Sequence, residues 1–358
     1  MSNKFLGGLV ATIAITATLA TGAASAGAAP TGTAVTRAPA SSNVSSTSRL
    51  TPEVARMVKG AGPAAEQKAL ASYWSPARMK AARSDSLLPS QKAAAGRSAR
   101  PQSLAASAKP QGPAARTAPA APLKVPKAAA LNSAIPMAYN PGYPVGSPVA
   151  RTSGKVFFTS FGLNYVCSAT VVNSEGKSEV WTAGHCVSDG KAWNTNWVFV
   201  PNYVNGWAPY GYWYAKALWT TSAWFNNNND FSNDVGAAVM WRNSGWRIAD
   251  YLGGQGIAWN YPLQYVYAFG YPQAAPFNGQ TLWAERGSTF AWGADQGMVN
   301  YMTGGSSGGA WLGWFNGSWG YINGHNDYKY GSLPAYMFSP YYGNQVANLF
   351  STVRGISA

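Results

Sequence analysis

Three short segments carry side chains that could act together in nucleophilic catalysis. His185 lies in Thr-Ala-Gly-His-Cys, Asp234 in Asn-Asp-Val-Gly-Ala, and Ser307 in Gly-Gly-Ser-Ser-Gly-Gly-Ala. A hydroxyl becomes a good nucleophile when an imidazole takes its proton and a carboxylate orients that imidazole. The sequence therefore predicts that His185 is a general base, Asp234 its orienting carboxylate and Ser307 the nucleophile.

The glycines around Ser307 indicate how a reaction centre could form there. They allow a sharp turn that exposes the hydroxyl, and they let the backbone N–H groups of Gly305 and Ser307 point at the spot where an oxyanion would develop. Gly/Ser runs are also common in flexible linkers. Apolar residues flank this run at 299–302 and 311–314, which favours a turn between buried strands.

The position of the acid in the chain decides between two hydrolase chemistries. The segment around Ser307 also fits the nucleophile elbow of α/β-hydrolases, in which the acid follows the serine and precedes the histidine. Between Ser307 and His325 there is no Asp or Glu, and the helix-rich pattern of that fold is missing. Among the other candidate acids, Asp230 follows four asparagines and Asp250 follows a basic stretch, whereas Asp234 directly opens an apolar run. The sequence favours the order histidine, acid, serine.

Short strands are the elements that must position these residues. From about residue 147 onward, short apolar and aromatic runs alternate with turn residues, including Asn-Gly pairs at 205–206, 278–279 and 316–317. Many short strands separated by such turns are typical of all-β sandwiches and barrels. Apolar residues at 346–353 recur instead at helical spacing, which predicts a short C-terminal helix.

Charge is distributed unevenly along the chain. Residues 1–135 carry 16 Lys and Arg against three acids, a net charge of +13, whereas residues 136–358 carry 10 against nine, a net charge of +1. The part that holds the three segments is therefore nearly neutral. This argues against binding to nucleic acid, although the whole chain has a net charge of +14.

The N-terminal part has the composition of targeting and processing segments. A basic residue precedes an apolar run at 5–20, and small residues follow, which predicts a cleaved signal peptide over 1–26 rather than a transmembrane helix. Residues 27–135 are rich in Ala, Pro, Ser, Arg and Lys, so we expect a largely disordered propeptide, with a permanent linker or stalk as the alternative. The functional domain is expected at 136–358. Export predicts a secreted, extracellular protein without membrane attachment after signal removal.

Cys167 and Cys186 are the two cysteines of the chain. In an exported protein an isolated pair is expected to be oxidised. Closing a loop of this size stabilises a fold by about 3 kcal/mol in the loop-entropy description. A zinc site is disfavoured, because the chain has only two cysteines and two histidines and the cysteines lack ligand spacing. The sequence indicates no metal and no other cofactor.

Together the three segments resemble the signature motifs of chymotrypsin-like (trypsin-like) serine peptidases. Cys167-Ser-Ala-Thr-Val-Val likewise resembles the strand whose cysteine pairs with the one beside the catalytic histidine. The resemblance covers roughly 145–358 and is closest to the bacterial secreted branch that includes the glutamyl endopeptidases. It implies two six-stranded antiparallel β-barrels, about 147–245 and 246–358, with the site in the cleft between them. It also implies a serine endopeptidase that cleaves protein or peptide substrates through an acyl-enzyme, and nothing in the sequence indicates more than a monomer.

One departure from the family pattern bears on activation. Digestive trypsins carry an Asp immediately before the nucleophile, and this Asp pairs with the new N-terminus once the propeptide is removed. Ser306 stands at that position here. We therefore expect the propeptide to act in another way, by covering the cleft or by assisting folding.

Other departures bear on specificity. Trypsins carry an Asp six residues before the nucleophile, and Tyr301 at that position disfavours cleavage after Lys or Arg. Glutamyl endopeptidases use a His on the following strand, and His325 occupies a similar place, where it would bind the carboxylate of a substrate Glu or Asp. The small hydroxyl residue expected five before the nucleophile is replaced by Met302, with Thr303 one later. His325, Thr303 and Met302 are thus the candidate substrate-binding residues.

A second class of function stays open from the sequence. Fifteen of the 16 tryptophans lie in residues 136–358. They could form stacking platforms for polysaccharide, and the protein would then be a catalytically weak or inactive peptidase homologue acting as a secreted binding module. Aromatic side chains more often fill cores and line clefts. The intact set of three segments therefore favours an active enzyme.

Overall fold

The computed structural model describes residues 42–99, 108–128, 143–189, 191–227 and 230–358. The signal peptide predicted at 1–26 lies outside the described residues, and so do residues 27–41, 100–107 and 129–135 of the predicted propeptide. The described residues all belong to one compact unit. Within these ranges, no helix has both the length and the apolar character needed to cross a membrane.

A closed six-stranded antiparallel barrel forms the first half of the predicted peptidase domain. Its strands are β4 (Ser153–Ser160), β5 (Leu163–Val171), β6 (Glu179–Thr182), β9 (Thr195–Pro201), β10 (Trp213–Thr221) and β11 (Gly236–Met240). They pair in the order β10-β11-β6-β5-β4-β9, and the pairing of β9 with β10 closes the barrel. The interior is filled by side chains, as expected for a small barrel. The predicted first barrel is confirmed.

Short elements surround this barrel and lead into its loops. They are α5 (Pro148–Thr152), β7 (Ser188–Asp189), β8 (Ala192–Trp193), α6 (Ser222–Asn226) and the 3-10 helix η3 (Phe231–Asn233). Strands β7 and β8 pair with each other directly after the His185 loop. Helix η3 ends at the residue before Asp234, so it sets the position from which that side chain projects.

The second half does not confirm the expected second six-stranded barrel. Its elements are α7 (Ile248–Leu252), β12 (Gly256–Trp259), β13 (Tyr265–Gly270), β14 (Trp283–Ser288), β15 (Phe290–Trp292), β16 (Asp295–Val299), β17 (Ala310–Gly313), β18 (Tyr321–His325), β19 (Tyr336–Pro340) and α8 (Asn344–Val353). Its strands form one sheet in the order β14-β13-β17-β18-β12 and a separate sheet β15-β16-β19. Because β12 and β18 run parallel, this half departs from a purely antiparallel barrel.

Helix α8 is the short C-terminal helix that the sequence predicts. Its buried residues are Val346, Leu349, Phe350 and Val353. Their spacing places them along one face of the helix, which packs on the core. The apolar pattern at the end of the chain is therefore satisfied by burial.

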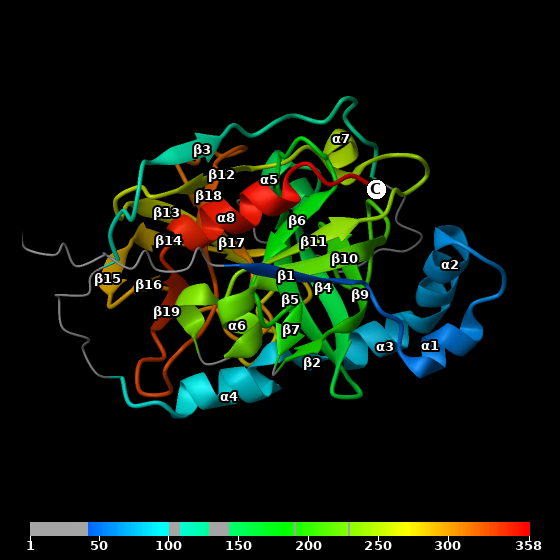
Figure 1. Ribbon diagram of the computed structural model, residues 1–358, viewed down its shortest axis with the longest axis horizontal. Coiled ribbons are helices and arrows are strands. Elements are labelled where there is room, and N and C mark those ends of the chain that lie inside the picture. The colour runs from blue at the N-terminus through cyan, green and yellow to red at the C-terminus, as the bar shows by residue number, and fades with distance from the viewer. Residues whose placement is uncertain (1–41, 100–107, 129–142, 190, 228–229) are drawn as a thin grey trace, which may run out of the picture. The chain divides into compact units, whose positions relative to one another are not determined.

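The N-terminal segment is folded onto the peptidase domain in its described residues. It contains β1 (Asn43–Thr47), α1 (Pro52–Met57), α2 (Pro63–Tyr73), α3 (Pro76–Ala81), β2 (Arg83–Ser84), the 3-10 helix η1 (Asp85–Leu87), α4 (Pro89–Gly96) and β3 (Ala115–Thr117). Strand β1 pairs with β10, β2 with β5 and β3 with β12 (Figure 1). This differs from the expectation of a largely disordered propeptide. The reason is that strands of the peptidase domain supply the pairing partners that the segment lacks on its own.

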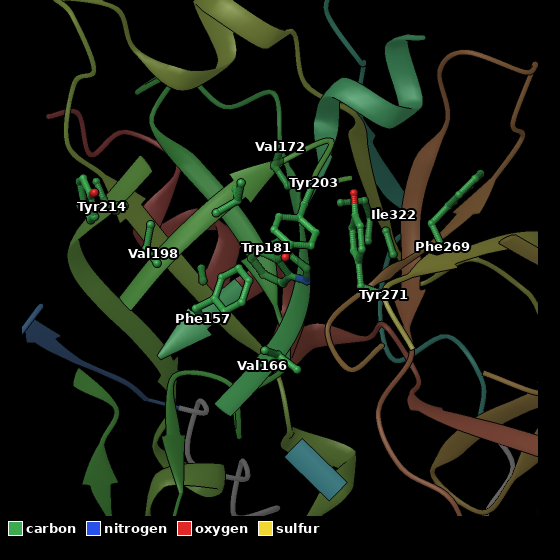
Figure 2. Close-up of a cluster of buried hydrophobic side chains, with 14 of the residues drawn as sticks. Phe157, Val166, Val172, Trp181, Val198, Tyr203, Tyr214, Phe269, Tyr271 and Ile322 are labelled. Atoms are coloured by element: carbon green, nitrogen blue, oxygen red, sulfur yellow. The ribbon is translucent and has the colours of Figure 1, made fainter. Parts of the chain in front are cut away.

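One apolar core joins the N-terminal segment to both halves of the domain. Figure 2 shows Phe157 and Trp181 of the barrel in the same cluster as Phe269 and Ile322 of the second half. Trp74, at the end of α2, belongs to this cluster too. Its ring lies 5.7 Å from that of Phe157, and its indole N–H donates to a backbone oxygen at 2.7 Å. Removal of the segment would expose this apolar surface to water.

Candidate active site

A buried histidine–aspartate pair forms the centre of the site. His185 follows β6 and Asp234 precedes β11, and the pairing of these two strands brings the two loops together. One carboxylate oxygen of Asp234 accepts from the backbone N–H of His185 at 2.7 Å, and the other lies 2.8 Å from Nδ1 of its ring. Two bonds to the same residue hold the imidazole in one orientation, which a general base requires.

The loop between β16 and β17 holds Ser307. Gly305 and Gly308 adopt φ values of 101° and 80°, a region that glycine enters without steric cost. Ser168 of β5 holds this loop in place through two hydrogen bonds. Its backbone N–H donates to the backbone oxygen of Ser307 at 2.7 Å, and its hydroxyl donates to the backbone oxygen of Gly305 at 2.9 Å. The N–H of Gly305 faces the site and donates to the carboxylate of Asp85.

A pocket of about 230 Å³ lies beside Ser307. From the peptidase domain its wall includes Ala274, Thr303, Gly304, Asp327, Tyr328, Lys329 and Met337. From the N-terminal segment it includes Asp85, Ser86, Gln91 and Ala95. The hydroxyl of Ser307 donates to the backbone oxygen of Asp327 at 3.3 Å. The pocket therefore adjoins the candidate nucleophile and is covered in part by the N-terminal segment.

Three carboxyl groups surround the ring of His185. Asp234 and Asp327 approach Nδ1 at 2.8 and 3.4 Å, and Asp85 lies 3.2 Å from Nε2. Burial by itself lowers the pKa of His185, but the carboxyl groups, led by Asp234, raise that pKa well above its usual value. Burial and the neighbouring Asp234 raise the pKa of Asp327 well above its usual value. Both shifts favour the protonated forms of His185 and Asp327.

Among the residues that the structure describes, two groups of side chains have ligand types that could hold a metal ion. The first combines His185 with Cys167 and Cys186, but these cysteines form the predicted disulfide, with Cα atoms 6.2 Å apart. The second is His185 with Asp234 and Asp327, whose ligand atoms lie within 4.8 Å of one another. These atoms are already engaged with each other. The arrangement fits proton transfer around one imidazole.

Solved proteases match the chain over almost their whole length. Protease Anisep from Arthrobacter nicotinovorans is 41% identical, and the match covers 58% of this chain and 98% of that one, with a TM-score of 0.56. The chain belongs to the chymotrypsin-like serine proteases. The thermostable serine protease AL20 from an extremophilic microorganism is 38% identical to it. That match covers 57% of the present chain and 97% of AL20, with a TM-score of 0.54. No described protein family and no curated protein matches the sequence.

The structure of this protease does not bring His325 or Met302 to the wall of the pocket. His325 is fully buried, its Nδ1 lies 2.9 Å from the hydroxyl of Tyr342, and burial lowers its pKa to about 4. A neutral ring held against Tyr342 is unsuited to bind a carboxylate. Thr303 does line the pocket, although its hydroxyl donates to the backbone of Ala274 at 2.6 Å.

Three residues of the site were missed by the reasoning from sequence. Lys329 is the one Lys or Arg among the residues that line the pocket, and Asp327 contacts His185. Both lie within four residues of His325, so the pocket wall includes residues close in the chain to the one predicted to bind substrate. Asp85 could have been noticed, because it is the single acid between Glu66 and Glu175.

Proposed function

We propose that this protease is a serine endopeptidase with Ser307 as nucleophile, His185 as general base and acid, and Asp234 as the residue that orients His185. The single observation that carries this proposal is the buried pair of His185 and Asp234 at 2.8 Å beside the pocket that Ser307 lines. An imidazole held in this way can accept the proton of a serine hydroxyl.

The proposed reaction has two halves. The oxygen of Ser307 attacks the carbonyl carbon of a peptide bond while His185 Nε2 takes the hydroxyl proton. The resulting oxyanion is stabilised by the backbone N–H groups of Gly305 and Ser307. His185 then gives its proton to the leaving amine, and an acyl-enzyme remains. Water, deprotonated by His185, hydrolyses the ester and restores Ser307.

We also propose that the protease is exported as a precursor. Residues 1–26 would be the signal peptide, and residues 27–135 would be a propeptide that is cut away from the domain at 136–358. The support for latency is that Ser307 is only 4% exposed while the N-terminal segment covers its pocket. The mature enzyme would act outside the cell, as a monomer, on protein or peptide substrates.

A serine-directed phosphonylating reagent tests the assignment of the nucleophile. We expect the processed enzyme to be labelled once per chain and the Ser307→Ala variant to remain unlabelled. Ser306→Ala is the matched control, because that hydroxyl donates to the backbone of Thr303 at 2.8 Å. Loss of labelling in Ser306→Ala alone, or persistence in Ser307→Ala, would contradict the proposal.

For specificity we propose cleavage after Glu or Asp, with Lys329 as the residue that binds the substrate carboxylate. Lys329 lines the pocket next to Ser307, and its ammonium group donates to two backbone oxygens, of Asn300 at 2.6 Å and Pro334 at 2.8 Å. An ammonium group has three donors, so one remains for a ligand. Lys329 is the one Lys or Arg among the residues that line this pocket, and the raised pKa of Asp327 weakens the negative charge close to it.

A further inference from the structure

The N-terminal segment enters the site through a short strand. Residues Arg83 and Ser84 of β2 pair in parallel with Tyr165 and Val166 of β5, one residue before Cys167 (Figure 1). The next residue, Asp85, is only 1% exposed. Backbone pairing therefore delivers one specific side chain to the catalytic centre.

The carboxylate of Asp85 binds two groups that the proposed reaction needs. One oxygen accepts the N–H of Gly305, the group expected to stabilise the oxyanion. The other lies 3.2 Å from Nε2 of His185, the nitrogen that must face the Ser307 hydroxyl. A negative oxygen at this N–H next to an imidazolium has the charge arrangement of the tetrahedral intermediate. The carboxylate carbon is a poor electrophile, so this ligand is not consumed.

Helix α4 holds Asp85 in place from the other side. The amide nitrogen of Gln91 lies 3.2 Å from Nδ1 and 3.5 Å from Nε2 of His185, so it rests over the ring. Leu88 is fully buried in the apolar core of the barrel. The backbone oxygen of Ala95 accepts from the N–H of Gly331 at 3.0 Å. The segment from 83 to 96 is thus anchored on both sides of the carboxylate.

We propose that Asp85 is an intramolecular inhibitor whose carboxylate takes the place of the reaction's oxyanion, and that the catalytic site binds the segment 83–96 as its partner until that segment is removed. The inference rests on the proposed function, because that proposal assigns Gly305 to the oxyanion hole and His185 to the role of general base. Inhibition by Asp85 explains why this protein can have Ser306 at the position where digestive trypsins require an Asp for activation. Activation then requires that the carboxylate of Asp85 leave the N–H of Gly305 and the ring of His185.

The test uses the uncut full chain and replaces Asp85→Asn, which keeps the shape and removes the charge. Glu66→Gln, in α2, is the matched control for loss of one acid elsewhere in the segment. The reagent reaches Ser307 only when the segment lifts. Losing a charge-assisted hydrogen bond should therefore raise the labelling rate of Asp85→Asn by about tenfold or more, while Glu66→Gln matches the parent. Equal rates in Asp85→Asn and the parent would overturn the inference.

A second readout does not depend on the reactivity of Ser307. In the full chain carrying Ser307→Ala, the His185 ring can be titrated by NMR with and without Asp85→Asn. We expect the pKa of His185 to fall by at least about one unit in Asp85→Asn, because a carboxylate beside Nε2 is lost while Asp234 and Asp327 remain. This fall supports the contact even if Ser307 proves not to be the nucleophile. An unchanged pKa overturns the inference.

Discussion

At the scale of single residues, the protonation of two side chains bears on what the pocket can bind. Burial and Asp234 raise the pKa of Asp327 well above its usual value, which weakens the negative charge of the wall. Burial lowers the pKa of Lys329 to about 8, against the opposing effect of Glu285. Lys329 is therefore charged at neutral pH and loses its charge as the pH rises through about 8. A preference for acidic substrate residues should follow that titration.

We predict that Lys329→Met lowers the ratio of kcat/KM for Glu over Leu substrates by about tenfold or more, because a buried carboxylate would lose its charged partner. In the parent enzyme the same ratio should fall as the pH rises above about 8. Paired peptide substrates that differ only at the residue before the cut measure it. A lower concentration of folded enzyme reduces both kcat/KM values equally, so it does not change their ratio.

His325→Gln is the comparison variant for this experiment. Its side chain contacts Tyr342 rather than the pocket, so the Glu-to-Leu ratio should stay near that of the parent. A drop in His325→Gln without a drop in Lys329→Met would restore the assignment made from the sequence and reject Lys329.

At the scale of elements, the disulfide links the strand that supports the Ser307 loop to the segment that carries His185, the proposed general base. Cys167 lies in β5 next to Ser168, and Cys186 directly follows His185. Both cysteines are fully buried. The bond therefore adds a covalent link between two parts of the site that are also joined by strand pairing and by a hydrogen bond from the Thr182 hydroxyl to the backbone oxygen of Ser168 at 2.8 Å.

We predict that replacing both cysteines by alanine lowers the free energy of unfolding by about 3 kcal/mol. The reason is that the disulfide reduces the conformational entropy of the unfolded chain by closing a loop of this size. Urea unfolding of the full chain in a Ser307→Ala background measures the change without self-digestion. A reducing agent present during unfolding should destabilise the parent by a similar amount and leave the double variant unaffected. No difference between the double variant and its parent would contradict this expectation.

At the scale of the whole molecule, buried titratable side chains make the free energy of unfolding depend on pH. Glu179 in β6 is fully buried, and burial raises its pKa to about 8. Its folded-state pKa lies above the value of an unfolded chain, so the folded protein holds a proton that the unfolded chain releases above about pH 4.5. This contribution to stability therefore falls as the pH rises from about 4.5 to 8.

We predict that Glu179→Gln, in the full chain with Ser307→Ala, is more stable than its parent at pH 8 by on the order of 3 kcal/mol, and that the gain shrinks toward zero near pH 4.5. Burial also lowers the pKa of Lys155 to about 7, but that residue is present in both proteins and cancels in the comparison. Urea midpoints at pH 5 and pH 8 measure the effect. A gain of equal size at both pH values would show that Glu179 is not titrating.

The sequence alone predicted the order of the three candidate segments, the disulfide and the C-terminal helix, and the resemblance of those segments to a known family implied the first barrel. Each depends on local patterns, such as glycines beside a serine or apolar residues at helical spacing. The assignment of His325 as a substrate-binding residue stays a prediction, and the structure places that side chain away from the pocket beside Ser307. His325 is the last residue of β18, whereas Asp327 and Lys329 of the pocket wall lie in the loop after it, and no local pattern shows how that loop folds back.

Only the tertiary structure decided what surrounds His185. Asp85 lies 100 residues before it, and Asp327 lies in the loop that follows β18 (Tyr321–His325) in the other half of the domain. Their contacts depend on the pairing of β2 with β5 and on how the two halves pack, which are long-range choices that no local spacing encodes. The triad could be proposed from the sequence because its motifs are local. The carboxylate proposed to keep it inactive became visible only when the chain was folded.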